Sequence, residues 1–455
     1  MELKACWGGI RKGKRLRCSE EIRDRDVLSE AERLINEFLN RIKEHRNILF
    51  SGLTTPFDPY INDLTNLFSN INAKLDEFKN IVLNENNKKE LEFLMTIRYI
   101  IKVLLKLVKE AKEWWLRIGR SELEKLVDGI INGKITVIIR GELKKDKDFM
   151  VHLYTEHLAV IINRIAKSGS VVMHITFTGL KDAYVVVPRL FDDDKLRAMQ
   201  NGWLMTDGTI HKGGYPEMGT NYLWQVIAWL MVFPGKNHVD VSGISINNGV
   251  RVIWLLTALD LKFEGRDVNA IKYGIAEDVA KYSNELFKVF LLPALLADGN
   301  FNIRKKIVKL AIGVVKYELW KPIIKNLMNM NFSEHDHEYI KEFRINSSKA
   351  VTLVRDMLSD SFIRVMIEVL SMFNDAKKLR QLIELANART KALGSSMIEI
   401  NGIKLTININ DKGNMELRAY VRIKQRLMKL QKDLRLLTLM LKYLSEVKDT
   451  QYTFL

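Results

Sequence analysis

Residues 291–299 read Leu-Leu-Pro-Ala-Leu-Leu-Ala-Asp-Gly, an apolar stretch that ends in an acid and a glycine. A similar stretch, residues 201–208, reads Asn-Gly-Trp-Leu-Met-Thr-Asp-Gly and ends 91 residues earlier. Each stretch predicts a helix that stops at Asp-Gly and leads into a strand, because glycine suits the left-handed position just past a helix end. One helix of this kind is an ordinary helix end and indicates no function by itself.

Two further blocks repeat downstream in the same order. Residues 221–224 (Asn-Tyr-Leu-Trp) correspond to residues 316–320 (Lys-Tyr-Glu-Leu-Trp), and each block is expected to open a second helix. Residues 245–248 (Ser-Ile-Asn-Asn) correspond to residues 344–347 (Arg-Ile-Asn-Ser), and each is expected to close a strand and cap a third helix, since Asn and Ser accept hydrogen bonds from free helix N–H groups. Ordered blocks with slowly growing offsets predict a duplicated unit of helix, two strands, helix, two strands, helix. The expected third helices are 249–259 and 348–358.

The second stretch resembles the LAGLIDADG homing-endonuclease family. It matches the nine-letter motif at its first, seventh, eighth and ninth positions, and the first stretch matches it through Gly202, Asp207 and Gly208. The resemblance implies an α+β fold in which tandem αββαββα repeats form a pseudo-symmetric, DNA-binding saddle within a monomer. It covers residues 190–360 and carries no information about either flank. It also implies a site-specific endonuclease of a mobile genetic element.

The resemblance places the two terminal acids next to each other on the floor of the saddle. Small residues one turn apart permit a close approach of the two helices. Asp207 and Asp298 then lie at adjacent helix C-termini, where the helix dipole and their mutual repulsion disfavour both carboxylates. A divalent metal, Mg²⁺, would compensate them, and metal-bound water would attack phosphorus. Both acids are therefore candidate catalytic residues and candidate metal ligands. The small residues are Gly202, Thr206, Ala294 and Ala297.

Two departures from the family pattern weaken the prediction of cleavage more than that of binding. Pro293 stands at the expected helix crossing, and a proline inside a helix removes a backbone hydrogen bond and can kink it. Active members of the family place a basic residue at the end of the fourth strand, whereas the matching positions here are Asn247 and Asn346. Lys341 and Arg344 lie on the same predicted strand and are candidates to replace that base.

Polar and basic side chains on the predicted strands supply a candidate DNA surface. A two-stranded ribbon fits the major groove, where Arg and Asn read base edges. The alternative for each such residue is an ordinary solvated strand face. The cluster His335-Asp336-His337 has no third ligand at zinc spacing, so a loop is expected there. The candidate DNA contacts are His211, Lys212, Asn302, Arg304, Lys306 and Lys309.

The flanks differ in pattern from the repeats. A basic N-terminal arm, residues 9–18, is expected to be a solvated tail, with a phosphate contact as the alternative. The basic helix expected over 422–447 would either pack on the preceding hairpin or extend the DNA footprint. The segment 133–190 is either a cap on the repeats or a separate domain, with a helix expected over 149–166 and strands over 135–139, 171–177 and 183–187. The predicted divisions are 1–132 (α-helical), 133–190 (α+β), 191–265 and 280–362 (the repeats) and 375–455 (helix-hairpin-helix, with strands at 397–409 and 415–421).

Composition narrows the partners. The net charge of +16 favours a polyanionic partner, which we expect to be double-stranded DNA, with RNA as an alternative. No apolar run is long enough for a membrane span, and Cys6 and Cys18 are too few for a disulfide scaffold, so an intracellular, reducing compartment is expected. Two functions remain: a Mg²⁺-dependent DNA endonuclease, and a non-cleaving nucleic-acid-binding protein such as a regulator, a replication factor or an RNA maturase.

Overall fold

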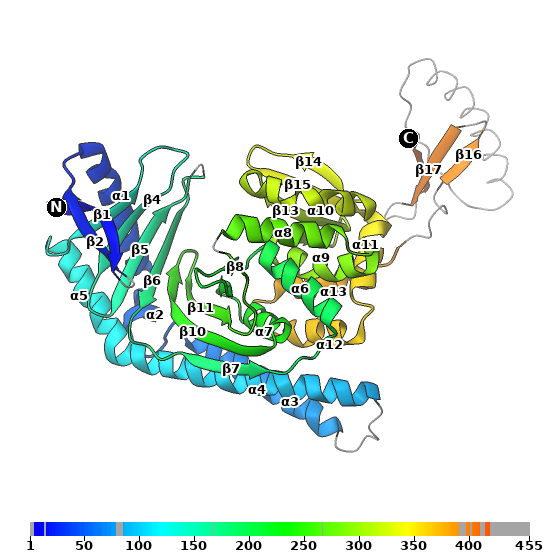
Figure 1. Cartoon of the computed structure of the whole chain (residues 1–455), viewed down its shortest axis with the longest axis horizontal. Helices are drawn as coiled ribbons and strands as arrows, with labels where there is room; N and C mark the ends of the chain where they lie inside the picture. Colours follow the sequence, from blue (N-terminus) through cyan, green and yellow to red (C-terminus); the bar gives the residue numbers. More distant parts are fainter. Residues whose placement is uncertain are drawn as a thin grey trace, which may run out of the picture.

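The computed structural model describes residues 4–12, 15–78, 85–166, 168–265, 267–390, 397–400, 403–409 and 415–418. The fold is a mixture of helices and mainly antiparallel sheets, as the predicted α+β class requires (Figure 1). Within the described residues, none of the helices combines the length and the apolar character needed to cross a membrane.

A single eleven-stranded sheet forms the first half of the molecule. Its strands follow the order β2-β1-β3-β4-β5-β6-β10-β11-β9-β8, and β7 pairs with the other end of β10. Only β1 and β3 are parallel neighbours; the other pairs are antiparallel. The sheet therefore runs across the predicted divisions at 132/133 and 190/191. The strands outside the repeats are β1 (Ala5–Lys12), β2 (Arg15–Glu21), β3 (Val137–Gly141), β4 (Phe149–Tyr154), β5 (Leu158–Arg164), β6 (Val171–Phe177) and β7 (Ala183–Val187).

Helices from the N-terminal region cover this sheet. Each has an apolar stripe at three- and four-residue spacing, such as Ala31, Leu34, Ile35 and Phe38, all fully buried. The long helix α4 runs under the sheet beside α3 and contacts α7 and β10 (Figure 1). The helices are α1 (Arg25–Glu44), α2 (Arg46–Phe50), α3 (Asp58–Glu77), α4 (Glu85–Trp114), a π turn (Trp115–Gly119) and α5 (Arg120–Ile131).

Two later segments repeat one order of elements. The first contains α6 (Asp193–Met205), β8 (Thr209–Ile210), β9 (Pro216–Thr220), α7 (Leu223–Val232), β10 (Gly235–Ile246), β11 (Val250–Ala258) and α8 (Val268–Ala280). The second contains α9 (Asn284–Asp298), β12 (Gly299–Asn302), β13 (Ile307–Gly313), a 3-10 turn (Val314–Lys316), α10 (Tyr317–Asn329), β14 (Ser333–Asp336), β15 (Ile340–Asn346) and α11 (Ser347–Met357). Both segments pair their strands in the spatial order first, second, fourth, third: β8-β9-β11-β10 and β12-β13-β15-β14.

Two short helices follow the second segment. α12 (Ser361–Leu370) packs on α7, and α13 (Lys377–Ala386) packs against α11 and β12. The sequence prediction missed α12 and placed a helix over the position of α13. β16 (Met397–Ile400), β17 (Ile403–Ile409) and β18 (Met415–Arg418) form a separate three-stranded antiparallel sheet, which agrees with the strands expected in this region. The turn between the strands of this expected hairpin and the helix expected at 422–447 lie outside the described residues.

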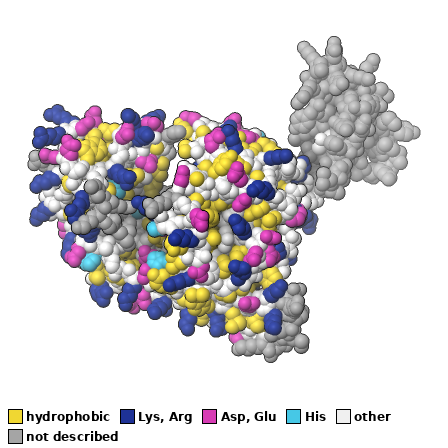
Figure 2. Space-filling view, viewed as in Figure 1, with side chains coloured by type: hydrophobic (Ala, Val, Ile, Leu, Met, Phe, Trp, Pro, Cys, Tyr) yellow, Lys and Arg dark blue, Asp and Glu magenta, His cyan; other side chains and the backbone are white. Residues whose placement is uncertain are grey.

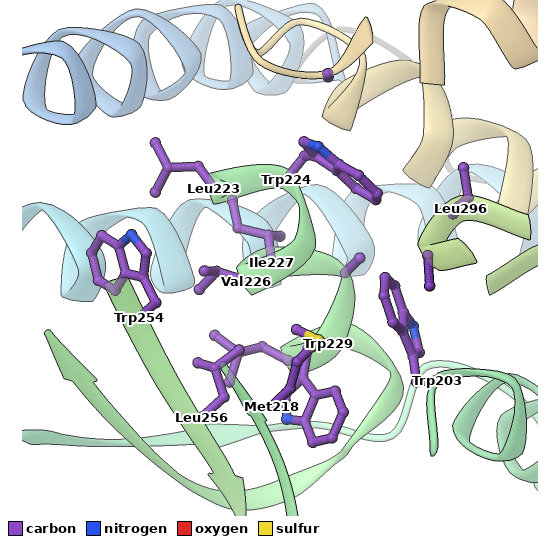
Figure 3. Close-up of a cluster of buried hydrophobic side chains, with 14 of the residues drawn as sticks. Trp203, Met218, Leu223, Trp224, Val226, Ile227, Trp229, Trp254, Leu256 and Leu296 are labelled. Atoms are coloured by element: carbon purple, nitrogen blue, oxygen red, sulfur yellow. The ribbon is translucent and has the colours of Figure 1, made fainter. Parts of the chain in front are cut away.

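A cluster of tryptophans and aliphatic side chains joins the first segment to the second. Trp203 of α6 lies between Trp224 of α7 and Leu296 of α9, with its ring 6.4 Å from that of Trp224 (Figure 3). Trp229 and Trp254 extend the cluster toward the sheet. All five side chains are buried, so the core is continuous from α9 to β11.

Two helices expected from the sequence are strands. Residues 149–166 form β4 and β5, joined by a short turn, and residues 250–258 form β11. Both stretches are rich in Val and Ile, and one set of alternate residues is buried in each strand, which is the period of a sheet rather than a helix. The correction also changes the repeat alignment: residues 245–248 end the third strand of their segment, whereas residues 344–347 end the fourth.

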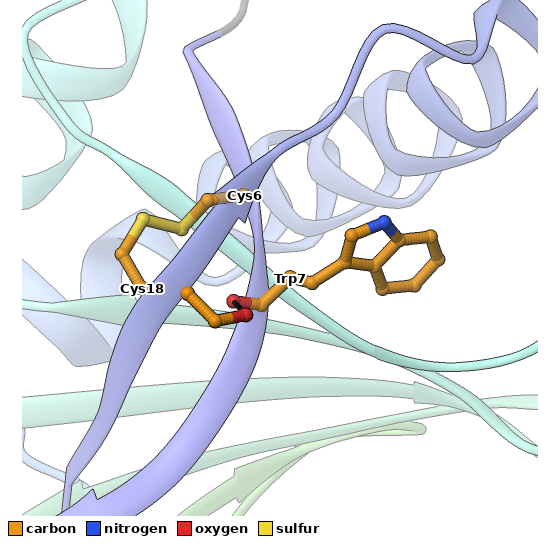
Figure 4. The surroundings of a disulfide bond; sticks show 4 residues. Cys6, Trp7 and Cys18 are labelled. Atoms are coloured by element: carbon orange, nitrogen blue, oxygen red, sulfur yellow. Dashed lines mark hydrogen bonds between the residues drawn. A yellow bond between two sulfur atoms is a disulfide. The ribbon is translucent and has the colours of Figure 1, made fainter.

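The N-terminal arm is a β-hairpin and not a solvated tail. β1 and β2 pair with each other, and β1 also pairs with β3. Cys6 and Cys18 form a disulfide between the two strands, with their Cα atoms 5.5 Å apart (Figure 4). The expectation from the sequence was only that two cysteines are too few for a disulfide scaffold; the structure joins them in one bridge between neighbouring strands.

Candidate functional site

The site is built on the two helices that carry the Asp-Gly sequences. α6 and α9 pack closely along their length, and Gly202 lies at their contact. A Cβ atom at Gly202 would lie 2.3 Å from the carbonyl oxygen of Phe290 and 2.5 Å from Cγ of Pro293. Only glycine permits this approach, because the neighbouring backbone oxygen cannot move away. Pro293 stands inside α9 at this crossing, and α9 continues through it as one helix.

The two acids follow this pair of helices. Asp207 comes two residues after the end of α6, and Asp298 is the last residue of α9. Both side chains are exposed, and their charges interact. The surrounding protein partly removes the Asp298 carboxyl group from water, and this desolvation raises its pKa; the negative charge of Asp207 raises the pKa further. The charges of the two carboxylates therefore act on each other at the ends of two packed helices.

The glycines after the acids have a different role from the one expected. Neither Gly208 nor Gly299 is left-handed: Gly299 has φ −89° and ψ 170°, and Gly208 is not among the residues with positive φ. Instead, a Cβ at Gly299 would lie 2.3 Å from the carbonyl oxygen of Leu295, and one at Gly208 would lie 2.9 Å from that of Trp203. These glycines let the strand start directly against the last helical turn.

The two acids differ in their hydrogen bonds. Asp207 Oδ2 accepts a hydrogen bond of 2.9 Å from Nε2 of Gln225. Gln225 is buried at the start of α7, and Thr220 donates to its Oε1. The carboxylate of Asp298 makes no hydrogen bond with the part of the chain that the structure describes. Asp207 is thus held in place, whereas Asp298 is positioned by its backbone alone.

Two lysines from outside the motif reach the same place. Lys272 of α8 is buried and donates a hydrogen bond of 2.8 Å to the carbonyl oxygen of Gly208. Lys378 of α13 donates to the carbonyl oxygens of Leu296, at 3.1 Å, and Ala297. These carbonyls belong to the last turn of α9, where the helix lacks internal partners and attracts cations.

The charges of these lysines act on both acids. Burial lowers the pKa of Lys272 to about 8, and the charge of Lys316 contributes to this, while Asp298 and Asp207 oppose it. Burial also lowers the pKa of Lys378, again against the two acids. Lys316, Lys378 and Lys272 are the cations that act most strongly on Asp298. Three ammonium groups therefore act on Asp298, and those of Lys272 and Lys378 also act on Asp207.

The arrangement does not fit a protein-held divalent cation. Carboxylate oxygens are suitable ligands for Mg²⁺, and Asp207 and Asp298 would be the residues to hold it. However, Lys272 and Lys378 occupy the nearby carbonyl oxygens and balance the two negative charges on which cation affinity depends. The described residues also contain no group of three or more His, Cys, Asp or Glu side chains that could hold a metal.

A cavity of about 660 Å³ opens beside Asp207. Sheet residues Gly219 and Ile253, the start of α7, the end of α9 and the segment 375–378 line it. Asp375, at its wall, accepts a hydrogen bond of 3.2 Å from the backbone N–H of Leu223. The cavity therefore lies where both repeats and the segment after them meet.

Lys341 and Arg344 lie on β15, as expected, but both are engaged there in ion pairs. Lys341 Nζ lies 2.6 Å from Asp336 Oδ1 and 5.0 Å from the centre of the Tyr317 ring. Arg344 donates two hydrogen bonds to Glu342. Neither is among the cations that act most strongly on Asp298. Asn247 accepts from Met173 N–H and from Arg41, and Asn346 precedes α11 without capping it by its side chain.

The residues predicted to contact DNA lie in two turns and on one face of the second sheet. Lys309, Glu342 and Arg344 lie on one face of the second sheet, while Val308, Leu310 and Ile312 on the other face are buried. Lys309 Nζ lies 3.0 Å from Glu342 Oε2, so this face carries paired charges. Of the remaining candidates, His211, Lys212, Asn302, Arg304 and Lys306 lie at or beside the β8–β9 and β12–β13 turns; Lys306 donates to the carbonyl oxygen of Arg389. His335 and Asp336 belong to β14 and not to a loop.

Surface charge on the visible face is mixed. Lys and Arg side chains are spread over both lobes, and Asp and Glu side chains lie among them (Figure 2). The net charge of +16 is therefore not gathered into one continuous stripe on this face.

Sequence reasoning missed Gln225, Lys272 and Lys378. Gln225 is the one polar residue in the otherwise apolar helix α7, and Lys272 is buried in a helix with an apolar face, so each was a visible exception to its local pattern. Lys378 carried no such signal, because Lys377 precedes it and its role depends on where α13 packs. No protein-family model matches the chain, and no curated protein is significantly similar to it.

Proposed function

We propose that this chain is a nucleic-acid-binding protein in which two LAGLIDADG-like repeats bind double-stranded DNA along their sheets. The observation that carries the proposal is the repeated order of α6–α8 and α9–α11. The first helices of the two segments, α6 and α9, pack against each other at Gly202. An aspartate and a pair of strands follow each of these helices. A coincidence of element order, strand order and motif position is improbable for two unrelated segments.

The turns β8–β9 and β12–β13 and the open sheet faces are the proposed contact surfaces. Exposed basic side chains at both turns, Lys212 and Arg304 among them, suit phosphate oxygens. The paired charges of Lys309, Glu342 and Arg344 suit readout of base edges more than unspecific attraction, because each cation already has an acidic partner.

The test is binding of labelled duplex DNA by fluorescence anisotropy in EDTA, over a range of salt concentrations. A protein that neutralises Z phosphates gives a slope of about −0.9Z in a plot of log affinity against log salt. Salt-dependent binding with a slope of at least about −3 is expected. A structured RNA of equal length, added as competitor, tests the RNA alternative. Absence of binding to either polymer at low salt would contradict the proposal.

Mg²⁺-dependent cleavage is the second candidate, because the charges of Asp207 and Asp298 act on each other at the ends of two packed helices. The lysines around them argue against it. Incubation with a random-sequence DNA library in Mg²⁺, followed by sequencing of ends, separates the two. Defined ends that disappear in Asp298→Asn while duplex binding persists would establish cleavage; binding without defined ends supports the binding function alone.

A further inference from the structure

We infer that Lys272 and Lys378 act as built-in counter-ions for the Asp207–Asp298 pair, so that this site does not take up a divalent cation. The inference deepens the proposed function, since it defines what stands at the centre of the DNA-binding surface. Two carboxylates at adjacent helix ends require compensation, and the chain supplies it with its own ammonium groups.

The contacts are specific to the helix ends. Lys272 reaches the carbonyl oxygen of Gly208, directly after Asp207, and Lys378 reaches those of Leu296 and Ala297, directly before Asp298. Each lysine comes from a helix outside the motif, α8 or α13, and the charge of each interacts with both acids. The last-turn carbonyl oxygens are the other oxygen ligands that a cation at this site would use, and they already accept from ammonium groups.

Electrostatics leads to the same conclusion. Two acids and two lysines leave the group neutral, and Lys316 adds a further positive charge that acts on both Asp298 and Lys272. A divalent cation would meet repulsion from three ammonium groups. A DNA phosphate would meet attraction from them and repulsion from two carboxylates, so DNA can approach this centre without a metal.

The experiment measures Mn²⁺ binding to the full chain by electron paramagnetic resonance, with no nucleic acid present. Wild type is expected to bind Mn²⁺ no more tightly than the millimolar range. Lys378→Met should tighten binding by about tenfold, because one nearby positive charge is removed. Lys272→Met should do the same. Lys377→Met is the matched control: Lys377 is exposed and lines the same cavity, but it makes no contact with the carbonyl oxygens.

Two outcomes would overturn the inference. One is micromolar Mn²⁺ binding by wild type that is lost in Asp298→Asn, a result that needs no lysine variant to fold. The other is an equal gain in Lys377→Met and Lys378→Met, which would show a general effect of charge. Because DNA binding in EDTA is measured separately, loss of DNA binding contradicts the proposed function, whereas tight Mn²⁺ binding contradicts only the counter-ion role.

Discussion

The two repeats have the same order of elements but lie in different surroundings. α7, the second helix of the first repeat, is buried along its whole length, because α4, α6, α12 and the sheet surround it. α10, its counterpart, buries only Trp320, Ile323 and Leu327 and is amphipathic. The strands of the first repeat form one end of an eleven-stranded sheet, whereas those of the second form a four-stranded sheet of their own.

This difference shows that the same order of elements can be built around a fully buried helix or around an amphipathic helix. Because other helices and the sheet surround α7, this helix must be apolar on all sides, whereas α10 needs an apolar surface on one side only. The two acids also differ: Asp207 is held by a hydrogen bond from buried Gln225, whereas the carboxylate of Asp298 makes no hydrogen bond within the described residues. Substitutions at corresponding positions of the two repeats can test how far the repeats differ in stability and in DNA binding.

The largest effect is expected at the contact between the two repeats. Gly202→Leu should lower the free energy of unfolding by about 3 kcal/mol or more, because the side chain would collide with the backbone of α9. Gly274→Ala is the control, since this glycine of α8 has open space around it; this change should stabilise the chain by up to about 1 kcal/mol. Urea unfolding measures both. Equal effects would show that the two helices do not depend on Gly202.

A second comparison concerns the N-terminus of α7, where the backbone N–H of Leu223 donates a hydrogen bond to Asp375 from outside the repeat, whereas α10 has no side-chain cap. Burial raises the pKa of Asp375 to about 6; the bond from Leu223 N–H opposes this shift, and the charge of Asp63 adds to it. The folded chain then binds more protons than the unfolded chain between about pH 4 and pH 6, so this group lowers stability as pH rises through that window.

Asp375→Asn keeps the acceptor for Leu223 and removes this dependence. Relative to wild type, the variant should gain about 2 kcal/mol between pH 4 and pH 7. Thermal unfolding across this range is the measurement. A constant difference between the two proteins at all pH values would show that the carboxyl does not titrate in this window.

The turns of the two repeats should contribute unequally to DNA binding. Arg304→Ala with Lys305→Ala removes two exposed cations from the β12–β13 turn and should reduce the salt slope by about 2. His211→Ala with Lys212→Ala should reduce it by about 1, since this pair contains one lysine in place of an arginine and a lysine. Anisotropy titrations at several salt concentrations give both slopes. Identical reductions would indicate that the two turns contact DNA alike.

The smallest effect is expected from the acids themselves. Asp298→Asn should raise duplex affinity in EDTA about two- to fivefold, because a carboxylate facing phosphate is repulsive. Asp207→Asn should raise it less, since the Gln225 hydrogen bond fixes that side chain and would be disturbed. A loss of affinity in either variant would mean that the acids hold the lysines in a binding geometry.

Much of the α+β pattern was readable locally. The sequence pattern located helices within residues 1–132 and a helix at the start of the region 375–455, and the Asp-Gly stretches located α6 and α9 together with the strands after them. The strands β4, β5 and β11 were missed because a short run of Val, Ile and Leu is compatible with either period; pairing with neighbouring strands decided it.

The sequence by itself determined that two helical stretches end close to an Asp-Gly pair and lead into strands, because these features depend on residue type and spacing along one segment. Tertiary structure alone decided what surrounds the acids. Lys272 and Lys378 lie 65 and 171 residues after Asp207 in the chain, and only the packing of α8 and α13 brings them to it. Long-range electrostatic compensation of this kind has no local pattern, since any lysine on any helix can supply it.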